Sequence, residues 1–208
     1  MNDKSRRRAG PSSSSPRPDL FTAPNGLPKG FCYRPNILSG GEEDGLAREV
    51  ADLPFKPFDF HGYYRQVVSF GCRFDYDRGA VVEASPFPSF LVSLRNKVAA
   101  IFDQPAEDFR QVLINEYRPG AGIGWHRDKA QFDEVVGVSL LAPCVLRFRR
   151  RARETWDGVS LAVEPCSAYL LSGAARTVWH SIPALDQLRY SITLPTLVAT
   201  VPSGEECM

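Results

Sequence analysis

The chain has 208 residues, with 25 lysines and arginines against 24 acidic residues, and a net charge of +1 does not by itself indicate a nucleic-acid partner. Its length suits one domain with a sizeable core, and no apolar run reaches the roughly 18 residues that would suggest a membrane span. Five cysteines without Cys-x-x-Cys spacing indicate free thiols in a reducing compartment, not a zinc site or a disulfide framework.

The N-terminal segment combines three consecutive arginines, four consecutive serines and several prolines. This composition buries too little apolar surface to offset the entropy of ordering, so we expect a disordered tail over 1–24, a folded domain over 25–200 and a short tail over 201–208. A solvated terminus is the favoured interpretation, and a basic arm contacting nucleic acid is the alternative. The segment lacks the apolar region of a secretory signal, so a cytoplasmic protein is expected, with a nuclear or organellar address left open.

Two helices are predicted before residue 105, after a short strand at 31–33. Ser39 is a candidate N-cap ahead of an acidic first turn, and the prolines at positions 54 and 57 end this first helix. The second helix is expected over 88–102, where apolar residues recur at helical spacing. We interpret it as a helix that packs on the outer face of a sheet.

From residue 112 onward, short alternating or apolar runs separated by Gly and Pro predict strands. They cover 112–118, 124–128, 135–142, 144–151, 158–163, 168–172, 178–182 and 189–197. Eight such strands suggest a double-sheet jelly roll. The expected fold is therefore α+β but mainly β, a double-stranded β-helix core with two supporting N-terminal helices.

A candidate metal site lies in the strand predicted over 124–128. Strand side chains alternate, so His126 and Asp128 are expected to share one face and Trp125 the other. With one more histidine they complete the 2-His-1-carboxylate triad that leaves open positions on Fe(II). His180 is the candidate third ligand. A His-x-Asp pair alone is more often a surface or capping pair, so the prediction of a metal site needs support from other residues.

A second observation supports the metal site: an arginine is expected on the inner face of the last predicted strand. Arg189, Ser191 and Thr193 alternate along it and share one side. An arginine facing a sheet interior requires an anionic partner, and a dicarboxylate cofactor beside a metal would be one.

In this order the motifs resemble the AlkB family of Fe(II)- and 2-oxoglutarate-dependent dioxygenases, over about residues 26–198. The matching positions are Asn115-x-Tyr117, Pro119-Gly120-Ala121, His126-x-Asp128, Gly137-Val-Ser-Leu140, His180 and Arg189-x-Ser191-x-Thr193. The resemblance implies that His126, Asp128 and His180 bind iron, and that 2-oxoglutarate is bound by Asn115, Tyr117, Arg189 and Ser191. It also implies oxidative demethylation, with O2, of alkylated bases in single-stranded DNA or RNA, releasing formaldehyde, succinate and CO2. Nothing suggests an oligomer, so a monomer is expected.

The aromatic segment 58–77 has two interpretations. By itself it predicts a β-hairpin whose aromatic side chains face the core, whereas in AlkB relatives the equivalent region forms a lid where flipped bases stack on aromatic rings. The candidate substrate-binding residues are Tyr63, Tyr64, Arg65, Phe70, Arg73 and Tyr76. The arginine-rich run 147–153 is similarly open, as a solvated turn or as an edge that contacts phosphates.

Two positions depart from the family pattern. Pro195 stands where relatives usually carry a second cofactor arginine, and losing that contact could weaken 2-oxoglutarate binding by about 1.5–3 kcal/mol. Ala130 stands where similar repair enzymes often have an acid that contacts the methylated base. Two other classes therefore stay open: a related oxygenase acting on a protein or small molecule, and a catalytically silent binding module.

Overall fold

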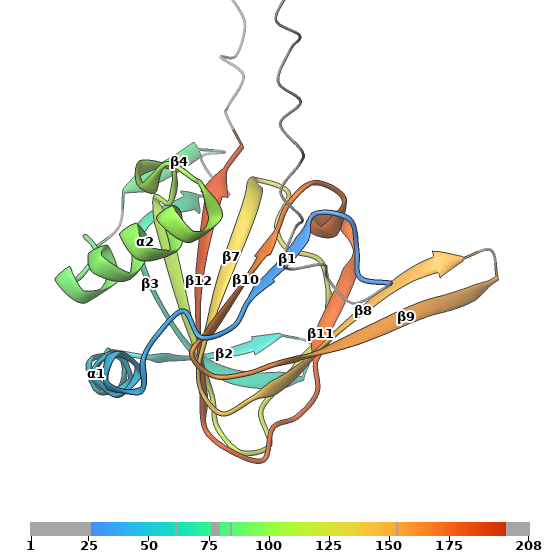
Figure 1. Cartoon of the computed structure of the whole chain (residues 1–208), viewed down its shortest axis with the longest axis horizontal. Helices are drawn as coiled ribbons and strands as arrows, with labels where there is room; N and C mark the ends of the chain where they lie inside the picture. The colour runs from blue at the N-terminus through green and yellow to red at the C-terminus, as the bar shows by residue number, and fades with distance from the viewer. Residues whose placement is uncertain (1–25, 61, 76–79, 84, 153, 199–208) are drawn as a thin grey trace, which may run out of the picture.

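The computed structural model describes residues 26–60, 62–75, 80–83, 85–152 and 154–198. The expected tails and the candidate residue Tyr76 lie outside these residues, and so does the side chain of Arg73. The described chain folds into two antiparallel sheets, with two helices on the outer side of the larger sheet (Figure 1). No helix among the described residues is both long and apolar enough to cross a membrane.

The larger sheet has the order β1-β10-β7-β12-β5-β3-β2, with β4 paired to β3. Its strands are β1 (Phe31–Arg34), β2 (Lys56–Phe60), β3 (Tyr63–Asp75), β4 (Ala80–Glu83), β5 (Gln111–Tyr117), β7 (Phe132–Leu141), β10 (Ser167–Leu171) and β12 (Arg189–Leu197). The smaller sheet has the order β6-β11-β8-β9, made of β6 (Ile123–His126), β8 (Cys144–Ala152), β9 (Thr155–Val163) and β11 (Trp179–Ile182). The eight strands predicted from residue 112 onward are β5 to β12, four in each sheet, which confirms the double-stranded β-helix.

Both helices form where the sequence predicts them. α1 (Gly40–Ala51) starts with a capping box, in which the Ser39 hydroxyl accepts from the Glu42 N–H and the Glu42 carboxylate accepts from the Ser39 N–H at 2.8 Å. It ends before Pro54, as expected. α2 (Ser89–Phe102) presents Leu91, Leu94 and Val98 to the core. Short 3-10 turns, η1 (Ala106–Asp108) and η2 (Gly173–Thr177), complete the described helical residues.

Two apolar cores lie on opposite faces of the larger sheet. The first, between this sheet and the helices, contains Ile114 of β5 together with Leu91 of α2. The second, between the two sheets, contains Tyr117 of β5 together with Phe148 of β8. Because side chains alternate along β5, one face of the strand packs under the helices while the other faces the space between the sheets. The candidate site lies in that inner space.

The described residues of the segment 58–77 belong to two antiparallel strands, in which β2 pairs with β3 and β3 continues the larger sheet beside β5. Its aromatic residues do not all face the core: Tyr64 is 68% exposed and Tyr63 is 42% exposed. Phe70 packs against the core beneath the helices, on the face of β3 opposite to Arg65. Alternation along β3 turns Phe70 away from the inner space, so the geometry gives no support to its predicted role as a substrate-binding residue.

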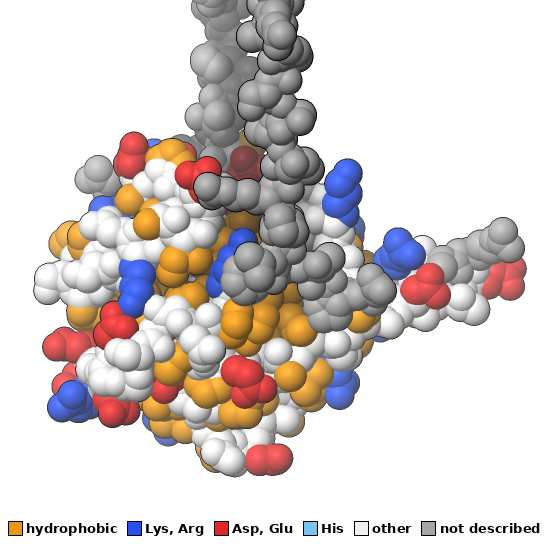
Figure 2. Space-filling view, in the orientation of Figure 1, with side chains coloured by type: hydrophobic (Ala, Val, Ile, Leu, Met, Phe, Trp, Pro, Cys, Tyr) orange, Lys and Arg blue, Asp and Glu red, His pale blue; other side chains and the backbone are white. Residues whose placement is uncertain are grey.

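The arm formed by β8 and β9 extends beyond the rest of the smaller sheet (Figure 1). β11 pairs with β8 only from Arg147 to Arg149, whereas β9 continues the pairing to Ala152. Figure 2 shows both basic and acidic side chains along this projecting arm. The described part of the arginine-rich run, 147–152, thus lies in β8, partly within the sheet and partly in the arm.

Candidate metal and cofactor site

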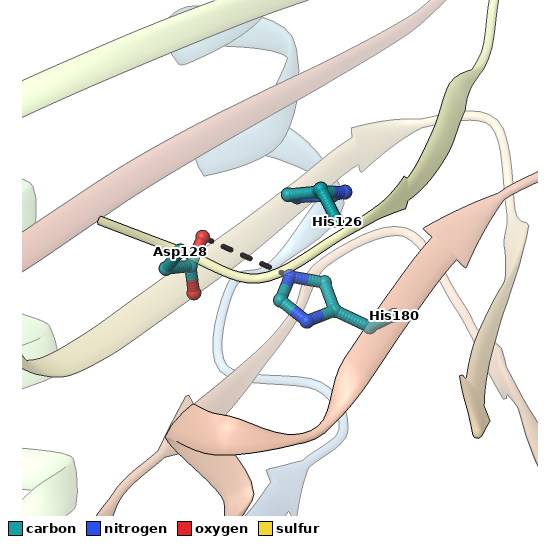
Figure 3. Close-up of side chains that lie close together, drawn as sticks. All are labelled: His126, Asp128 and His180. Carbon is teal, nitrogen blue, oxygen red and sulfur yellow. Dashed lines mark ion pairs between the residues drawn. The ribbon is translucent and has the colours of Figure 1, made fainter. Parts of the chain in front are cut away.

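Three candidate metal ligands meet between the sheets (Figure 3). His126 ends β6, and His180 lies directly opposite it on β11, with ring centroids 4.3 Å apart. Asp128 completes the group, and the ligand atoms of the three side chains lie within 4.8 Å of one another. Two imidazoles and one carboxylate are the donor set of the facial triad, so these residues fit an Fe(II) ion.

Asp128 reaches the triad by a different route from the one predicted. β6 ends at His126, so Asp128 belongs to the following loop and does not share a strand face with His126. Its position depends on Arg176 of η2, which is 8% exposed and donates to Asp128 Oδ2 at 2.7 Å. The other carboxylate oxygen lies 3.7 Å from His180 Nε2.

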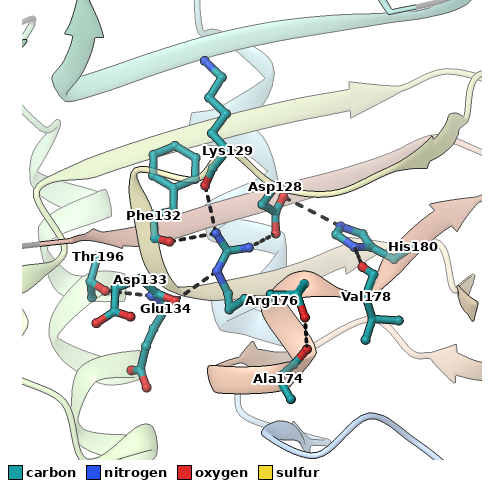
Figure 4. A network of polar contacts seen from close by, with 11 residues as sticks. Asp128, Lys129, Phe132, Asp133, Glu134, Ala174, Arg176, Val178, His180 and Thr196 are labelled. Carbon is teal, nitrogen blue, oxygen red and sulfur yellow. Dashed lines mark hydrogen bonds and ion pairs between the residues drawn. The ribbon is translucent and has the colours of Figure 1, made fainter. Parts of the chain in front are cut away.

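Arg176 also holds the backbone of the loop (Figure 4). Its Nε donates to the Asp133 carbonyl at 3.0 Å, and its Nη2 donates to the carbonyls of Lys129 and Phe132 at 3.1 and 2.9 Å. One buried guanidinium therefore positions both the ligand and the loop that carries it. Sequence reasoning missed Arg176, whose one signal is its place four residues before His180 in an irregular segment.

Backbone carbonyls orient both histidine rings. Nδ1 of His126 lies 2.9 Å from the Gly124 carbonyl, and Nδ1 of His180 lies 3.2 Å from the Val178 carbonyl. Carbonyls only accept, so each Nδ1 donates, and Nε2 is the ring nitrogen through which each histidine would bind a metal. Burial, reinforced by the neighbouring His180, lowers the pKa of His126 to about 4. Burial raises the pKa of Asp128, but the hydrogen bond and charge of His180, together with Arg176, outweigh it and lower that pKa.

The predicted cofactor residues also come together. Arg189 lies opposite Tyr117, and Ser191 lies opposite Asn115, in the pairing of β12 with β5. Asn115, Tyr117 and Ser191 line a cavity of about 410 Å³ that also contains the three metal ligands. One continuous space therefore adjoins both the metal ligands and the cofactor residues.

The surroundings of Arg189 indicate whether a dicarboxylate such as 2-oxoglutarate fits the cavity. It is fully buried, and among the described residues the hydrogen bond of its side chain is the one from Nε to the Ser139 hydroxyl at 3.2 Å. Its two terminal nitrogens are buried without a hydrogen bond to any described residue. Buried cationic donors without acceptors are costly, and a carboxylate can accept from both at once. The residues therefore fit 2-oxoglutarate.

Tyr169 of β10 lines the same cavity and was not predicted. Its ring lies against Gly137 of β7, where an added Cβ would come within 2.3 Å of it. Burial raises the pKa of the Tyr169 hydroxyl, although the charge of Arg189 opposes this. Within an apolar strand pattern Tyr169 resembles core, so the sequence carried no signal for a polar role.

The candidate substrate-binding residues of β3 lie in different places relative to the cavity. Arg65 lines the cavity, donates from Nε to Asn115 Oδ1 at 2.8 Å, and stacks on Phe58 with Cζ 4.8 Å from the ring centroid. Its Nη1 is buried and unpartnered among the described residues. Tyr63 packs over Gly124, next to the metal ligands, and Tyr64 faces outward.

The two departures from the family pattern both border the site. Pro195 lines the cavity and pairs in register with Val135 of β7. Ala130 lines a neighbouring depression of about 650 Å³, which shares His126 and Asp128 with the cavity. Two of the metal ligands, His126 and Asp128, thus border both spaces.

Comparison with known proteins agrees with this geometry. The family model described as the 2OG-Fe(II) oxygenase superfamily matches residues 56–196, and the chain belongs to this superfamily. It is therefore an oxidoreductase that uses Fe(II), 2-oxoglutarate and O2. Its relatives place it, within that class, in the AlkB family.

Two relatives and one solved structure illustrate the similarity. "Alkylated DNA repair protein ALKBH8 homolog" of Arabidopsis thaliana is 30% identical over 57% of this chain and 42% of its own length. "tRNA (carboxymethyluridine(34)-5-O)-methyltransferase ALKBH8" of Mus musculus is 28% identical over 75% of this chain and 24% of its own length. This chain thus matches less than half the length of either relative. "The structure of OsALKBH1" aligns with a TM-score of 0.57 at 15% identity, covering 80% of this chain and 96% of that one, and supports the fold.

Proposed function

We propose that this protein oxidatively demethylates alkylated bases in single-stranded DNA or RNA. The observation that carries the proposal is that His126 and Asp128 border two neighbouring spaces: one fits the cofactor, and the other is open and edged by Trp125 and Trp179. The names of the relatives, which refer to alkylated DNA repair and to tRNA, support a nucleic-acid substrate.

Each proposed role follows from a contact described above. His126, Asp128 and His180 would hold the iron, with both histidines oriented by carbonyls and Asp128 by Arg176. Arg189 would pair with a carboxylate of 2-oxoglutarate, with Tyr117 beside it.

When bound, iron and 2-oxoglutarate use O2 to oxidise a substrate C–H bond, with succinate and CO2 as co-products. An N-methyl group oxidised in this way becomes hydroxymethyl and leaves as formaldehyde. Apolar residues such as Leu146 and Ile182 line part of the cavity. The protein binds and orients, and no separate side-chain acid or base is required.

The test is mass spectrometry of single-stranded oligonucleotides that carry 1-methyladenine or 3-methylcytosine, incubated with Fe(II), 2-oxoglutarate and O2. Loss of one methyl group, with equimolar formaldehyde, is expected for the wild type and not for a folded His126→Ala variant. Succinate formation without any change in oligonucleotide mass would reject the nucleic-acid substrate while retaining the oxygenase.

A second candidate, an oxygenase acting on a protein or small molecule, is favoured by one observation. Ala130 gives the open depression a methyl group where a carboxylate could have contacted a base. Such an enzyme would consume 2-oxoglutarate faster with its own substrate and would not respond to methylated oligonucleotides. The silent binding module that the sequence left open disagrees with membership of an oxygenase superfamily.

The setting of the protein is also proposed. Cys32, Cys72, Cys144 and Cys166 are free thiols, which supports a reducing compartment such as the cytoplasm. We further propose a monomer. Fractionation of cells and light scattering of the purified chain test these two statements.

A further inference from the structure

A face of alternating arginine and tryptophan side chains covers the outer side of the smaller sheet. His126, His180 and Phe148 point between the sheets, so their strand neighbours point outward. We call this outer surface the Arg–Trp face. Its residues are Trp125 of β6, Arg127 just after it, Trp179 of β11, Arg147 and Arg149 of β8, and Trp156 of β9.

These side chains stack across all four strands. The Arg149 guanidinium lies 4.2 Å from the Trp125 ring centroid and 4.4 Å from that of Trp156, so indole rings flank it on two sides. Arg127 lies 4.9 Å from the ring centroid of Trp179. Stacking occupies the flat faces of a guanidinium and leaves its terminal N–H groups for hydrogen bonding to a phosphate. In Arg149 these are the Nη1 and Nη2 groups, because Nε is buried.

The strand residues of the face carry charge of one sign. Among the described residues within β6, β8, β9 and β11 whose side chains point outward there is no Asp or Glu, and Glu154 lies outside these strands, in the turn just before β9. Asp157 of β9 points the other way, where it pairs with Arg150 at 3.9 Å. The face therefore complements a polyanion.

Two further features favour a single-stranded nucleic acid over an acidic protein segment. Trp156 is 47% exposed, and exposed indoles stack on bases, which an acidic peptide lacks. In addition, Trp125, Arg127 and Trp179 form one wall of the open depression that reaches His126 and Asp128. A strand lying on this face would thus lead directly to the metal ligands.

We propose that the Arg–Trp face binds the single strand that flanks the base presented to the metal site. Arginine edges contact its phosphates, and Trp156 stacks on one of its bases. The assignment rests on the proposed nucleic-acid substrate, but it concerns affinity away from the reacting base and can be tested without turnover.

The experiment measures binding of a fluorescein-labelled, unmethylated single-stranded oligonucleotide to the full chain by anisotropy, over a series of salt concentrations. The test variants are Arg147→Gln alone and combined with Arg149→Gln. The matched control is Arg150→Gln, which removes an arginine from the same strand but from its opposite face. Melting temperatures show whether each variant is folded. If the double variant does not fold, Arg147→Gln alone still tests the proposal, because Arg147 is exposed.

We expect the double variant to lose about tenfold or more in affinity at low salt. The slope of log Kd against log salt should flatten by about 1.4, because two phosphate contacts with a single strand contribute about 0.7 each. Arg150→Gln should bind like the wild type. Trp156→Ala should weaken binding and remove part of the tryptophan quenching, and Trp156→Phe should restore affinity. With a methylated mononucleotide, whose chain does not reach the face, all variants should turn over at the wild-type rate.

Three results would overturn the proposal: no binding of the oligonucleotide by the wild type, equal losses in Arg147→Gln and Arg150→Gln, or displacement by polyglutamate as effective as by the oligonucleotide. The last would indicate an acidic protein partner. Failure of demethylation together with the expected binding losses would reject the proposed reaction and leave the Arg–Trp face as a nucleic-acid surface.

Discussion

A single buried arginine gives the clearest link between stability and cofactor binding. The terminal nitrogens of Arg189 lack acceptors among the described residues, which leaves a buried cation unsatisfied until a carboxylate arrives. Evolution of a stable apoprotein alone would favour an apolar residue there. The position therefore trades apoprotein stability for ligand binding.

Arg189→Met is accordingly expected to raise the free energy of unfolding of the apoprotein by about 1–3 kcal/mol, because it removes unsatisfied buried donors. It should also abolish the stabilisation by 2-oxoglutarate, which for the wild type is about 2.7 kcal/mol at one hundred times Kd. Urea unfolding with and without 2-oxoglutarate and Mn(II) measures both effects. Arg110→Met, an exposed control, should alter neither. A destabilised apoprotein that still responds to 2-oxoglutarate would contradict this reading of Arg189.

Arg176 stabilises the apoprotein, in contrast to Arg189, because its Nε, Nη1 and Nη2 all donate to acceptors. Arg176→Met should lower the free energy of unfolding by about 3–5 kcal/mol, since Asp128 loses its buried counter-charge. Metal affinity should fall about 10- to 100-fold. Mn(II) titration and urea unfolding provide the measurements, and Thr177→Ala, at the exposed neighbouring position, is the control. Wild-type metal affinity in Arg176→Met would show that the loop holds Asp128 without the arginine.

The lowered pKa of His126 predicts a pH dependence of the metal-free protein. Between about pH 6.5 and about pH 4 the unfolded chain protonates this imidazole and the folded chain does not. Protons therefore favour unfolding, and the free energy of unfolding falls as the pH drops through that window, with a slope of up to about 1.4 kcal/mol per pH unit. His126→Gln lacks the titrating group. Chelator-treated wild type should lose stability faster than this variant on acidification, and parallel pH profiles would refute the shift.

At the scale of the strand, close contact between neighbours restricts what β7 tolerates. An added Cβ at Gly137 would overlap the Tyr169 ring, so Gly137→Ala must displace a side chain that lines the cavity. We expect a loss of about 1–3 kcal/mol and weaker 2-oxoglutarate binding. Adding Tyr169→Leu should restore much of the stability. Gly158→Ala, where the new atom meets only the Phe148 carbonyl at 3.4 Å, is the matched control and should be tolerated.

Strand elements were predictable because a two-residue period and Gly or Pro punctuation mark them locally. β8 and β12 were recovered almost to the residue, and the inward side of Arg189 and Ser191 followed from alternation. Asp128 shows the limit. Strand alternation correctly predicted that Asp128 lies beside His126, but its premise was wrong. The strand ends at His126, and Arg176 directs the Asp128 carboxylate instead. Contacts made across the fold from irregular segments have no local pattern.

Across the whole molecule, the site joins the two sheets. His126 and His180 belong to the smaller sheet, whereas Arg189, Tyr117 and Asn115 belong to the larger one. β6 and β11 have only four residues each, so few backbone hydrogen bonds hold the part of the smaller sheet that carries the ligands. A metal and a dicarboxylate bound together would connect this weakly held part to a sheet supported by helices.

Hydrogen exchange should reveal that connection. Adding Mn(II) and 2-oxoglutarate is expected to slow exchange most in β6 and β11, because these short strands open locally at low cost in the metal-free protein. β7 and β12, at the centre of the larger sheet, should already be protected and should change little. His126→Ala should show no such slowing under the same conditions. Equal slowing in both sheets would mean that the molecule opens as one unit, and that the ligands stabilise it globally rather than by joining a weaker sheet to a stronger one.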